Sequence, residues 1–585
     1  MFELIVSLLI YLVLLIPVGR YLYHIMAGQH TAADVVFDRV DGAIYRLGRI
    51  HPEDQMNWKQ YAVAFLMTNG VMMLIGYVIL RLQSLLVLNP NQVGAMSSDL
   101  SFNTIISFMT NTNLQHYAGE SGLTYLSQML VITFMMFVSA ASGYAVCAAF
   151  IRGITGHSRN SLGNFYRDLV RIITRVLLPF SIVGGLLLVW QGVPQNLSGN
   201  LVVDTLEGAK QVITSGPVAA LEIIKHLGTN GGGFMGANAA SPIENPTVLT
   251  NLIEMYSMML LPGACVIAFG KMAQDARKRR LSEKAPKTVL QERKSLTATL
   301  LGREGRSIFL AMSILFLIGL GLCFWAEWQG NPAVAEVGLS QTAGNMEGKE
   351  MRLGTTLSSL FTTVTTSFTT GSVNNMHDSL TPLGGLVPLL HMMLNVVFGG
   401  KGVGLMNMIL YALLAVFICG LMVGRTPEYL GRKIEGREMK LTALAIIIHP
   451  LLILAFSALA VATMAGQAGI TNEGYHGLSQ ILYEFASSAA NNGSGFEGLA
   501  DNTLFWNVTT GVVMFLGRYL PIVIQLAIVG SLMKKNYVNE SAGTLRTDTA
   551  SFSVILVFIV YIFAALTFFP ALALGPVAEQ LTLLG

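Results

Sequence analysis

The sequence is dominated by apolar segments long enough to cross a membrane. A spanning helix needs about 20 apolar residues, and only 12% of this chain is charged, against about 25% in soluble domains. Ten segments qualify, near residues 2–23, 60–83, 123–152, 167–191, 249–271, 306–327, 383–424, 441–465, 503–533 and 549–575. We therefore expect a multi-pass helical membrane protein. Residues 2–23 lack a basic leader and a cleavage motif, so we expect them to remain as a helix.

Four loops rich in glycine, threonine and asparagine interrupt this apolar pattern. They are Thr110–Asn113, His226–Phe234, Thr369–Asn374 and Ala490–Ser494. The short pieces before them cover residues 102–109, 218–226, 357–368 and 478–488. Each piece is too short to span a bilayer but long enough for a re-entrant half-helix, and a long apolar helix follows each loop. The expected unit is therefore spanning helix, re-entrant helix, loop and spanning helix, repeated four times.

The expected fold is an all-α polytopic membrane protein. It has about ten transmembrane helices, with four helix–re-entrant loop–helix repeats arranged pseudo-fourfold around a cation filter. Thr112, Gly231, Gly371 and Gly493 recur at spacings of roughly 120 to 140 residues, the weak internal symmetry that transporters show. The expected units are 1–58 (first helix and cytoplasmic loop), 59–152 (repeat 1), 153–272 (repeat 2), 273–424 (cytoplasmic loop and repeat 3), 425–535 (repeat 4) and 536–585 (last helix).

The composition of the loops favours a weakly hydrated monovalent cation. Glycines such as Gly231 allow backbone carbonyls to turn toward a shared axis, where they replace the hydration shell of an ion. The hydroxyls of Thr112, Thr229 and Thr370 offer further acceptors. No ring of Asp or Glu lines the loops, so K⁺ fits better than Ca²⁺ or Mg²⁺. The alternative is a set of glycine-rich surface loops, which four equivalent places in the topology disfavour.

A second glycine-rich stretch, Gly399–Gly404, interrupts the seventh apolar segment. Non-helical backbone at membrane depth is tolerated only where it is buried or lines a water-filled path. A lipid-facing position would not accept Lys401. We interpret the stretch as a flexible gate beneath the filter, and the alternative is a packing kink with a snorkelling lysine. Gln115, directly after the first loop, either faces the ion path or makes structural hydrogen bonds.

The distribution of Lys and Arg predicts the orientation. Loop 271–306 is strongly basic, and loops 39–59, 152–171, 425–440 and 534–546 are also basic. Segments 84–122 and 467–502 contain no Lys or Arg. Alternating helices place the basic loops on the cytoplasmic side, so the four glycine or amide loops and both termini are expected outside.

The sequence contains no phosphate loop of the form GxxxxGK followed by Ser or Thr. The loops expected in the cytoplasm are also too short for a domain that hydrolyses nucleotide. We therefore expect this chain to bind no nucleotide. If transport is active, its energy must come from a partner or from an ion gradient.

Five longer motifs stand out along the chain: GTNGGGF (228–234) with Glu244–Pro246, VNNMHDSLTPLGG (373–385), VVFGGKGVG (396–404), GRTPEYLGRKI (424–434) and SSAANNGSGF (487–496). Together they resemble the potassium-binding A subunit family of the bacterial Kdp potassium-transporting ATPase. The resemblance covers essentially the whole chain. It implies the fold of the superfamily of K⁺ transporters, with one helix added at each end. It also implies a non-catalytic subunit in the bacterial inner membrane, with K⁺ as the transported ion.

The same resemblance implies partners and site residues. The chain would select external K⁺ and deliver it to a P-type ATPase B subunit, with C and small F subunits completing the complex. Its other surroundings are membrane lipid, and no nucleic acid is expected. The implied filter residues are Thr112, Asn113, Asn230, Gly231, Gly232, Thr370, Gly371, Ser372, Asn492, Gly493 and Ser494. Gln115 would lie near a tunnel mouth, and Gly400, Lys401 and Gly402 would belong to the gating loop.

Two other classes of protein remain to be weighed. A stand-alone K⁺ channel or an ion-gradient-driven K⁺ transporter shares the repeat architecture, but the extra first and tenth helices and the five motifs favour the pump subunit. A membrane enzyme would need a nucleophile, an acid and a base that converge at membrane depth. The sequence offers no such set.

Overall fold

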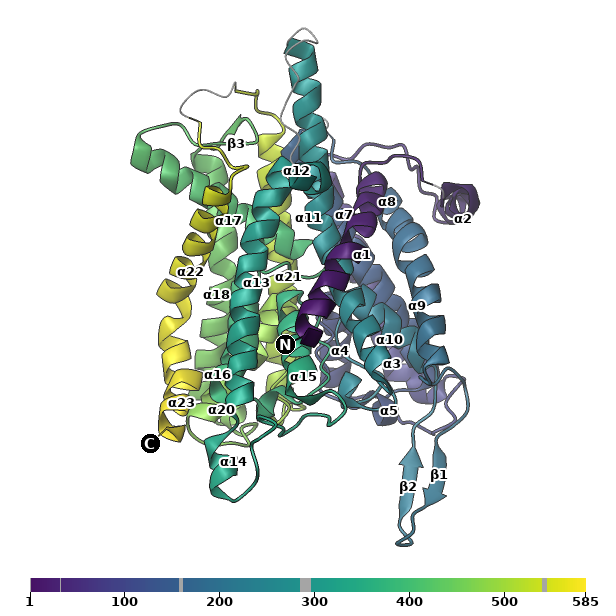
Figure 1. Cartoon of the computed structure of the whole chain (residues 1–585). Helices are drawn as coiled ribbons and strands as arrows, with labels where there is room; N and C mark the ends of the chain where they lie inside the picture. Colours follow the sequence, from purple (N-terminus) through teal and green to yellow (C-terminus); the bar gives the residue numbers. More distant parts are fainter. Residues whose placement is uncertain (1, 32, 157–160, 285–295, 539–543, 585) are drawn as a thin grey trace.

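Long helices dominate the architecture (Figure 1). The computed structural model describes residues 2–31, 33–156, 161–284, 296–538 and 544–584. Ten spans in this part are long and apolar enough to cross a membrane. Their principal helices are α1 (Phe2–Met26), α3 (Trp58–Leu82), α7 (Phe134–Thr155), α9 (Leu178–Trp190), α11 (Val248–Lys284), α13 (Arg303–Gln329), α17 (Val403–Val423), α18 (Gly436–Ala462), α21 (Leu504–Leu532) and α22 (Ala550–Leu572). The prediction of about ten spans is confirmed.

The seventh apolar segment is not one helix. Helix α16 (Pro382–Leu394) ends at Asn395, which has a positive φ of 48°, and α17 begins only at Val403. The intervening backbone contains the glycine-rich stretch that the sequence marked as an interruption. The expected segment 383–424 is therefore a short helix, a break and one spanning helix.

The four expected re-entrant pieces are also helices. They are α4 (Ser98–Met109), α10 (Val218–Leu227), α15 (Gly354–Ser367) and α20 (Tyr475–Ala490). At 10 to 16 residues they are shorter than a bilayer span. All four lie in the lower half of the molecule in Figure 1, the half that carries the β1–β2 hairpin. Each one ends at one of the four polar loops.

Smaller elements connect these helices. The short helices are α2 (Asp34–Leu47), α5 (Gly119–Gly122), α6 (Tyr125–Ser127), α8 (Phe165–Ile172), α12 (Leu296–Leu301), α14 (Pro332–Glu336), α19 (Met464–Gln467) and α23 (Ala578–Leu583). Strands β1 (Leu201–Asp204) and β2 (Lys210–Ile213) pair antiparallel with Leu201 opposite Ile213. Strands β3 (Glu428–Tyr429) and β4 (Arg432–Lys433) form a second, smaller hairpin. These hairpins lie in connecting loops, so the fold remains mostly helical.

Local side-chain chemistry explains where several helices begin. Asn57 precedes α3 and accepts hydrogen bonds from the backbone N–H groups of Lys59 and Gln60, at 3.0 and 3.1 Å. The Gln60 side chain in turn accepts from the Asn57 N–H at 3.0 Å, which completes a capping box. Thr503 caps α21 in a similar way through the Trp506 N–H. Such caps satisfy backbone donors that a helix start leaves without partners.

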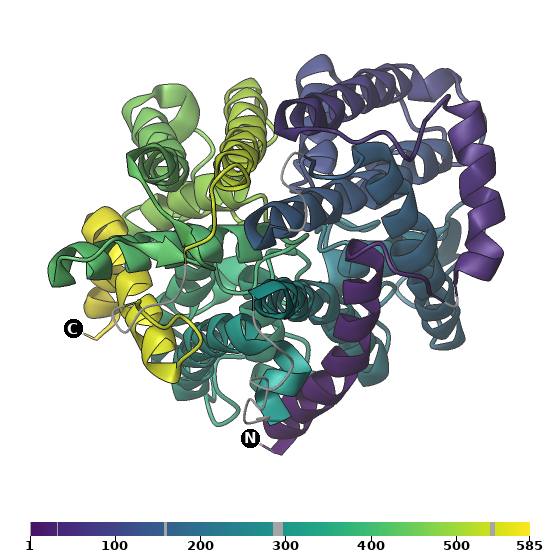
Figure 2. The same cartoon turned by 90° about the horizontal axis from the view of Figure 1, so that it is seen from above.

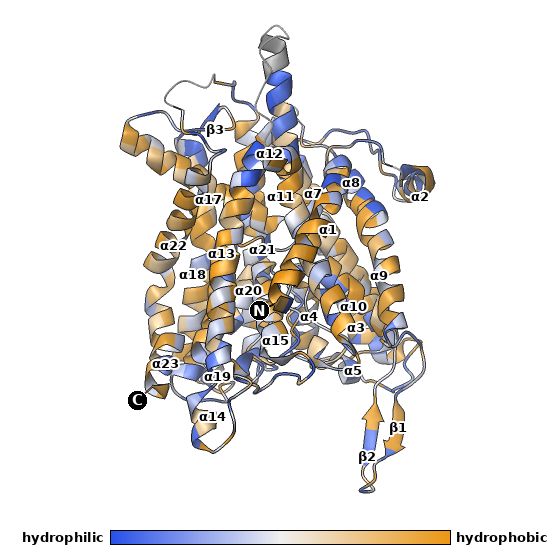
Figure 3. Cartoon of the chain, in the orientation of Figure 1, coloured by the Kyte–Doolittle hydropathy of each residue, from blue (hydrophilic) through white to orange (hydrophobic). Residues whose placement is uncertain are grey.

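Burial orders the helices from the centre outward. In the most apolar 18-residue stretch of each span, 78% of the residues are buried in the spans of α7 and α11, but only 28% in those of α1, α3 and α18. Seen from above, α1 and α22 lie at the edge of the molecule (Figure 2). The flanks of the outer helices are strongly hydrophobic (Figure 3), as lipid-facing surfaces require. The polar loops are therefore enclosed by the inner helices.

The two ends of the bundle differ in character. Helix α12 and strand β3 lie at the end opposite α14 and the β1–β2 hairpin (Figure 1). The connections at the α12 end are those that the sequence marks as basic. Residues 285–295, which belong to the basic loop 271–306, lie outside the described residues. The four re-entrant helices and the basic connections thus occupy opposite ends.

Helices α11 and α13 cross at two glycines, and this crossing yields a stability prediction. A Cβ at Gly305 would lie 2.9 Å from the Gly270 Cα and 3.0 Å from the Val266 carbonyl oxygen. We expect Gly305→Leu to push the helices apart and to lower the free energy of unfolding by about 1–3 kcal/mol, measured by thermal unfolding. Gly321→Leu on the same helix is the matched control, because a Cβ there meets nothing within 4 Å. Equal losses in both variants would contradict this account.

Candidate functional site

The four polar loops share one backbone geometry. Each re-entrant helix ends at a residue with positive φ: Asn111 (62°), Thr229 (46°), Thr369 (48°) and Asn491 (56°). The N–H of the following residue then donates to a carbonyl five residues back: Thr112 to Ser107 (2.9 Å), Asn230 to Lys225 (2.8 Å), Thr370 to Thr365 (2.8 Å) and Asn492 to Ser487 (3.0 Å). Sequences that differ from one another thus build the same turn four times.

A second residue with positive φ follows in each loop. These residues are Asn113 (60°), Gly231 (119°), Gly371 (95°) and Gly493 (108°). The spacing in the sequence aligned Thr112 with the three glycines, but the backbone aligns Asn113 with them. The first repeat can use asparagine because this residue tolerates the left-handed conformation better than most. The expected internal symmetry is therefore shifted by one residue in the first loop.

Backbone carbonyl oxygens of different loops crowd together at these glycines. A Cβ on Gly231 would overlap the carbonyl oxygen of Thr370 and lie 3.0 Å from that of Asn492 and 3.1 Å from that of Thr112. A Cβ on Gly493 would overlap the Thr112 carbonyl oxygen. Glycine is required here both by its φ and by this close approach. Oxygens from three loops thus meet against the backbone of the fourth.

The surroundings of these oxygens favour a cation without supplying a full negative charge. The carbonyl ends of α4, α10, α15 and α20 point toward the loops, and each carries a partial negative charge. The side chains of the loops are neutral. A cavity of about 270 Å³ lies beside the loops and is lined by Asn113, Gly232, Gly371 and Gly493, among others. An ion could reach the carbonyls from this cavity.

The threonine hydroxyls that the sequence offered as acceptors mostly brace the loops. The Thr112 hydroxyl lies 2.8 Å from the Thr110 hydroxyl and accepts from the Asn491 amide at 3.0 Å. The Thr229 hydroxyl donates to the Gly228 carbonyl at 2.7 Å and accepts from the Lys401 N–H at 2.9 Å. Among the described residues, the buried Thr370 hydroxyl has no hydrogen-bond partner.

Amide side chains at the helix ends join neighbouring loops, and the sequence interpretation missed their role. The Asn111 amide donates to the Thr229 carbonyl at 2.8 Å, and its oxygen accepts from the Ser139 hydroxyl at 2.9 Å. The Asn492 amide donates to the Thr365 carbonyl at 3.0 Å. The signal was present, because every loop has Asn or Thr at the position where its helix ends. Such groups hold the carbonyls in place from behind.

Gln115 joins the first loop to the second. Its amide nitrogen donates to the Gly233 carbonyl at 3.1 Å, and its oxygen accepts from the Gly233 N–H at 2.7 Å. The same residue lines the cavity beside the loops. Gln115 therefore makes structural hydrogen bonds, which was one of the two interpretations of this residue. It also forms part of the cavity wall.

Buried charges support the second loop from behind. The Lys225 ammonium donates to Glu244 at 2.9 Å and to the Asn238 side chain at 2.8 Å. Glu244, the first residue of the Glu244–Pro246 motif, also accepts from the Met235 N–H at 2.6 Å. These residues are buried. Removing one partner would leave a buried charge without compensation. The role of Glu244 in the motif is therefore structural.

His226 links the second re-entrant helix to the third loop. Its Nδ1 lies 2.9 Å from the Glu222 backbone carbonyl oxygen, and its Nε2 lies 2.8 Å from the Ser372 hydroxyl oxygen. Ser372 also contacts the Asn238 side chain at 3.2 Å. This contact positions one implied filter residue from a neighbouring repeat.

Lys401 reaches the backbone where two of the re-entrant helices end. It lies in the break before α17 with a φ of 46° and is 1% exposed. Its ammonium donates to the Asn111 carbonyl at 2.9 Å and to the Asn491 carbonyl at 2.6 Å. A Cβ on the preceding Gly400 would lie 2.5 Å from the Thr229 hydroxyl oxygen, so the break passes directly beneath the loops. The side chain points inward, which excludes the snorkelling alternative.

Comparison with known proteins identifies the family. A family model described as the potassium-transporting ATPase A subunit matches residues 5–581. The chain belongs to this family. The potassium-transporting ATPase potassium-binding subunit of Clostridium acetobutylicum is 56% identical over 578 residues, 99% of each chain. The subunit of the same name from Staphylococcus haemolyticus is 51% identical over 581 residues, 99% of this chain and 100% of that one.

A solved structure shares the fold of this family member. The potassium transporter TrkH from Vibrio parahaemolyticus has a TM-score of 0.52 over 89% of this chain and 96% of its own, at 14% identity. At this identity the likeness concerns the fold alone. It agrees with the four-repeat architecture expected from the sequence, and the family match confirms the resemblance drawn from the five motifs.

The double contact of Gln115 with Gly233 gives a testable prediction. Gln115→Leu removes both hydrogen bonds and leaves the Gly233 N–H and carbonyl without these partners, at a cost of about 1–3 kcal/mol. We expect roughly tenfold or faster amide hydrogen exchange at residues 231–236, measured by mass spectrometry. Gln211→Leu, on exposed strand β2, is the control. Unchanged exchange in Gln115→Leu would show that the contact does not hold the loop.

Proposed function

We propose that the chain is the non-catalytic, potassium-binding subunit of an ATP-driven potassium importer. The observation that carries this proposal is the approach of backbone carbonyls from different loops to one another at Gly231. The proposed filter consists of Thr112, Asn113, Asn230, Gly231, Gly232, Thr370, Gly371, Ser372, Asn492, Gly493 and Ser494. K⁺ is the transported ion, and this chain binds no nucleotide. The names of the relatives, potassium-binding subunits of potassium-transporting ATPases, support the assignment.

Neutral oxygens explain the choice of a monovalent ion. Ca²⁺ and Mg²⁺ favour carboxylate ligands, and the four loops offer none. Backbone carbonyls can replace the weakly held water of K⁺, provided that several approach at once. The repeated turn and the amide braces hold those carbonyls in position before the ion arrives.

Gly400, Lys401 and Gly402 form the proposed gate. The Lys401 ammonium occupies carbonyl oxygens of Asn111 and Asn491 at the inner end of the filter. An ion that moves inward would have to displace this side chain from both carbonyl oxygens. Gly402, with a φ of 78°, gives the break the freedom that such a movement needs. Gln115 stands at the other end, in the wall of the outer cavity.

The proposal extends to partners and location. The ATP-hydrolysing partner is a P-type ATPase B subunit, with C and F subunits in the same complex. The chain lies in the bacterial inner membrane, with lipid around it and the filter loops facing outside. The basic connections at the end opposite the re-entrant helices support this orientation. The six units expected from the sequence, with repeats at 59–152, 153–272, 273–424 and 425–535, remain the proposed division of the chain.

Gly231→Asp tests the filter and the partnership together. The new side chain would strike the Thr370 carbonyl and place a carboxylate at the axis. We expect the K⁺ concentration for half-maximal ATP hydrolysis by the complex purified through this chain to rise at least about tenfold. Rb⁺, NH₄⁺ or Na⁺ should then also stimulate hydrolysis. Gly208→Asp is the control, a glycine with a φ of 80° outside the site with nothing within 4 Å of its Cβ position.

Two results would contradict the proposal in different ways. An unchanged K⁺ requirement and ion preference in Gly231→Asp would overturn the filter assignment. A purified chain that carries no ATPase yet conducts K⁺ in liposomes would instead indicate a stand-alone channel or an ion-gradient-driven transporter.

Lys401→Met tests the gate. Methionine has similar length but no charge, so both carbonyls lose their tether and the inner end of the filter opens to K⁺. We expect K⁺ flux through the complex in liposomes without ATP to rise about tenfold, while Lys401→Arg stays close to the wild-type rate. Lys59→Met, at an exposed position at the start of α3, controls for the loss of a positive charge. Passive flux that stays at the wild-type rate in Lys401→Met would exclude a gating role.

A further inference from the structure

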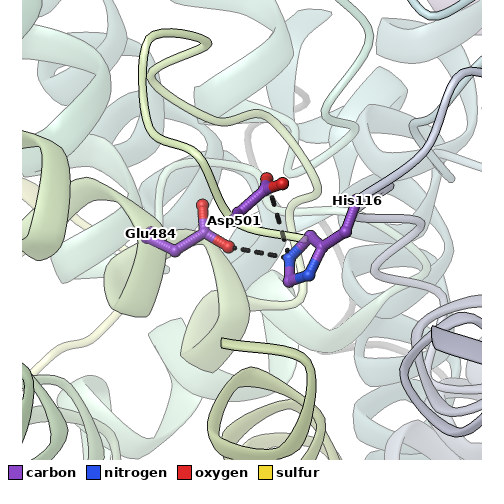
Figure 4. A group of neighbouring side chains, drawn as sticks. All are labelled: His116, Glu484 and Asp501. Carbon is purple, nitrogen blue, oxygen red and sulfur yellow. Dashed lines mark hydrogen bonds and ion pairs between the residues drawn. The ribbon is translucent and has the colours of Figure 1, made fainter. Parts of the chain in front are cut away.

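A histidine at the outer end of the filter faces two carboxylates (Figure 4). The Nε2 atom of His116 lies 3.2 Å from Glu484 Oε1 and 3.8 Å from Asp501 Oδ2. His116 and Glu484 are buried, whereas the Asp501 side chain is 26% exposed. The three residues come from the segment after the first loop, from α20 and from the segment that follows the fourth loop. Of the three, His116 and Asp501 line the outer cavity, as does Asn113.

Asn507 determines which nitrogen of His116 carries hydrogen. The Asn507 amide nitrogen donates to Asp99 Oδ2 at 2.8 Å and to Asn502 Oδ1 at 3.2 Å. Its oxygen is therefore the atom that lies 2.7 Å from His116 Nδ1, and Nδ1 must donate. In a neutral ring, Nε2 then presents a lone pair to two carboxylates. A ring nitrogen that faces two carboxylates is stabilised by a positive charge, which a proton on the ring or a bound cation can supply.

The geometry fits a metal ion as that charge. The ligand atoms of His116, Glu484 and Asp501 all lie within 4.8 Å of one another. Zn²⁺ takes nitrogen and carboxylate ligands at about 2.0–2.2 Å in a tetrahedron, which places the ligand atoms about 3.3–3.6 Å apart. The distances of 3.2 and 3.8 Å bracket that range. Metal-ligating histidines also donate their other N–H to a fixed acceptor, and Asn507 provides it here.

We propose that His116, Glu484 and Asp501 form a binding site for a divalent transition-metal cation of the Zn²⁺ class. Two carboxylates and a neutral imidazole balance its charge. Asp501 lines the outer cavity, so water can complete the coordination from that side. A bound ion would connect the first repeat to the fourth across the mouth of the filter. It would also cancel negative charge at the entrance and thereby hinder the approach of K⁺, an effect that rests on the proposed function.

Two other histidine clusters lack this feature. His226 lies near Glu222 and Glu254, but its Nε2 is already hydrogen-bonded to the Ser372 hydroxyl. His476 lies between Asp378 (3.0 Å) and Glu579 (2.8 Å), each facing a different ring nitrogen. Each ring nitrogen of His476 is thus already engaged by one carboxylate, so His476 is a suitable control.

Metal binding can be measured directly on the purified complex. Isothermal titration with ZnCl₂ and elemental analysis should show one Zn²⁺ per chain. We expect His116→Gln and Asp501→Asn each to weaken binding at least about tenfold, while His476→Gln binds like wild type. Thermal unfolding of each variant verifies that it is folded, and the two ligand variants test the site independently. Equal Zn²⁺ affinity in wild type and His116→Gln would overturn the site.

The effect on K⁺ is a separate readout. Zn²⁺ should raise the K⁺ concentration for half-maximal ATP hydrolysis about tenfold in wild type and leave it unchanged in His116→Gln. Zn²⁺ that binds without changing the K⁺ requirement overturns the inhibitory role but not the site. No Zn²⁺ binding, together with an NMR titration showing a doubly protonated His116 ring at neutral pH, would show that a proton supplies the charge and overturn the proposal. A wrong filter assignment would appear differently: Gly231→Asp would keep the wild-type K⁺ requirement, while Zn²⁺ would still bind to the wild-type complex.

Discussion

The structure depends on carbonyl oxygens of different loops being held close together. Such oxygens repel one another, and no backbone adopts this arrangement without support from its surroundings. Each loop therefore places two residues with positive φ around one residue whose N–H is tied to its own re-entrant helix. The helices end at the loops with their partially negative ends, which strengthens the preference for a cation. The ten spans enclose this centre and bury polar backbone that lipid would not tolerate.

Side chains behind the loops turn four separate turns into one unit. Asn111, Gln115 and His226 each connect a loop or helix of one repeat to the backbone or hydroxyl of another. Lys401 and Gly400 close the inner end in the same way, from the break before α17. These buried contacts tie the loops to one another. Under the proposed function, the filter and the gate therefore share one set of contacts.

The sequence predicted the architecture well because its strongest signals are long and repeated. Apolar segments of bilayer length, and short pieces that end at polar loops, survive an error of a few residues in their boundaries. Single positions were harder to predict. Spacing alone aligned Thr112 with Gly231, whereas φ shows that Asn113 is the equivalent residue. The His116 cluster was missed because Glu484 and Asp501 come from distant parts of the chain, and only folding brings them together.

The most direct measurement locates the ion itself. Crystals or particles of the complex prepared with Tl⁺ in place of K⁺ would reveal bound ions by their scattering. We expect density on the axis between the loops, coordinated by the carbonyl oxygens of Thr112, Asn230, Thr370 and Asn492. The Gly231→Asp complex should lack this density. Ions found only in the outer cavity or at the inner break, with none among these carbonyls, would contradict the account.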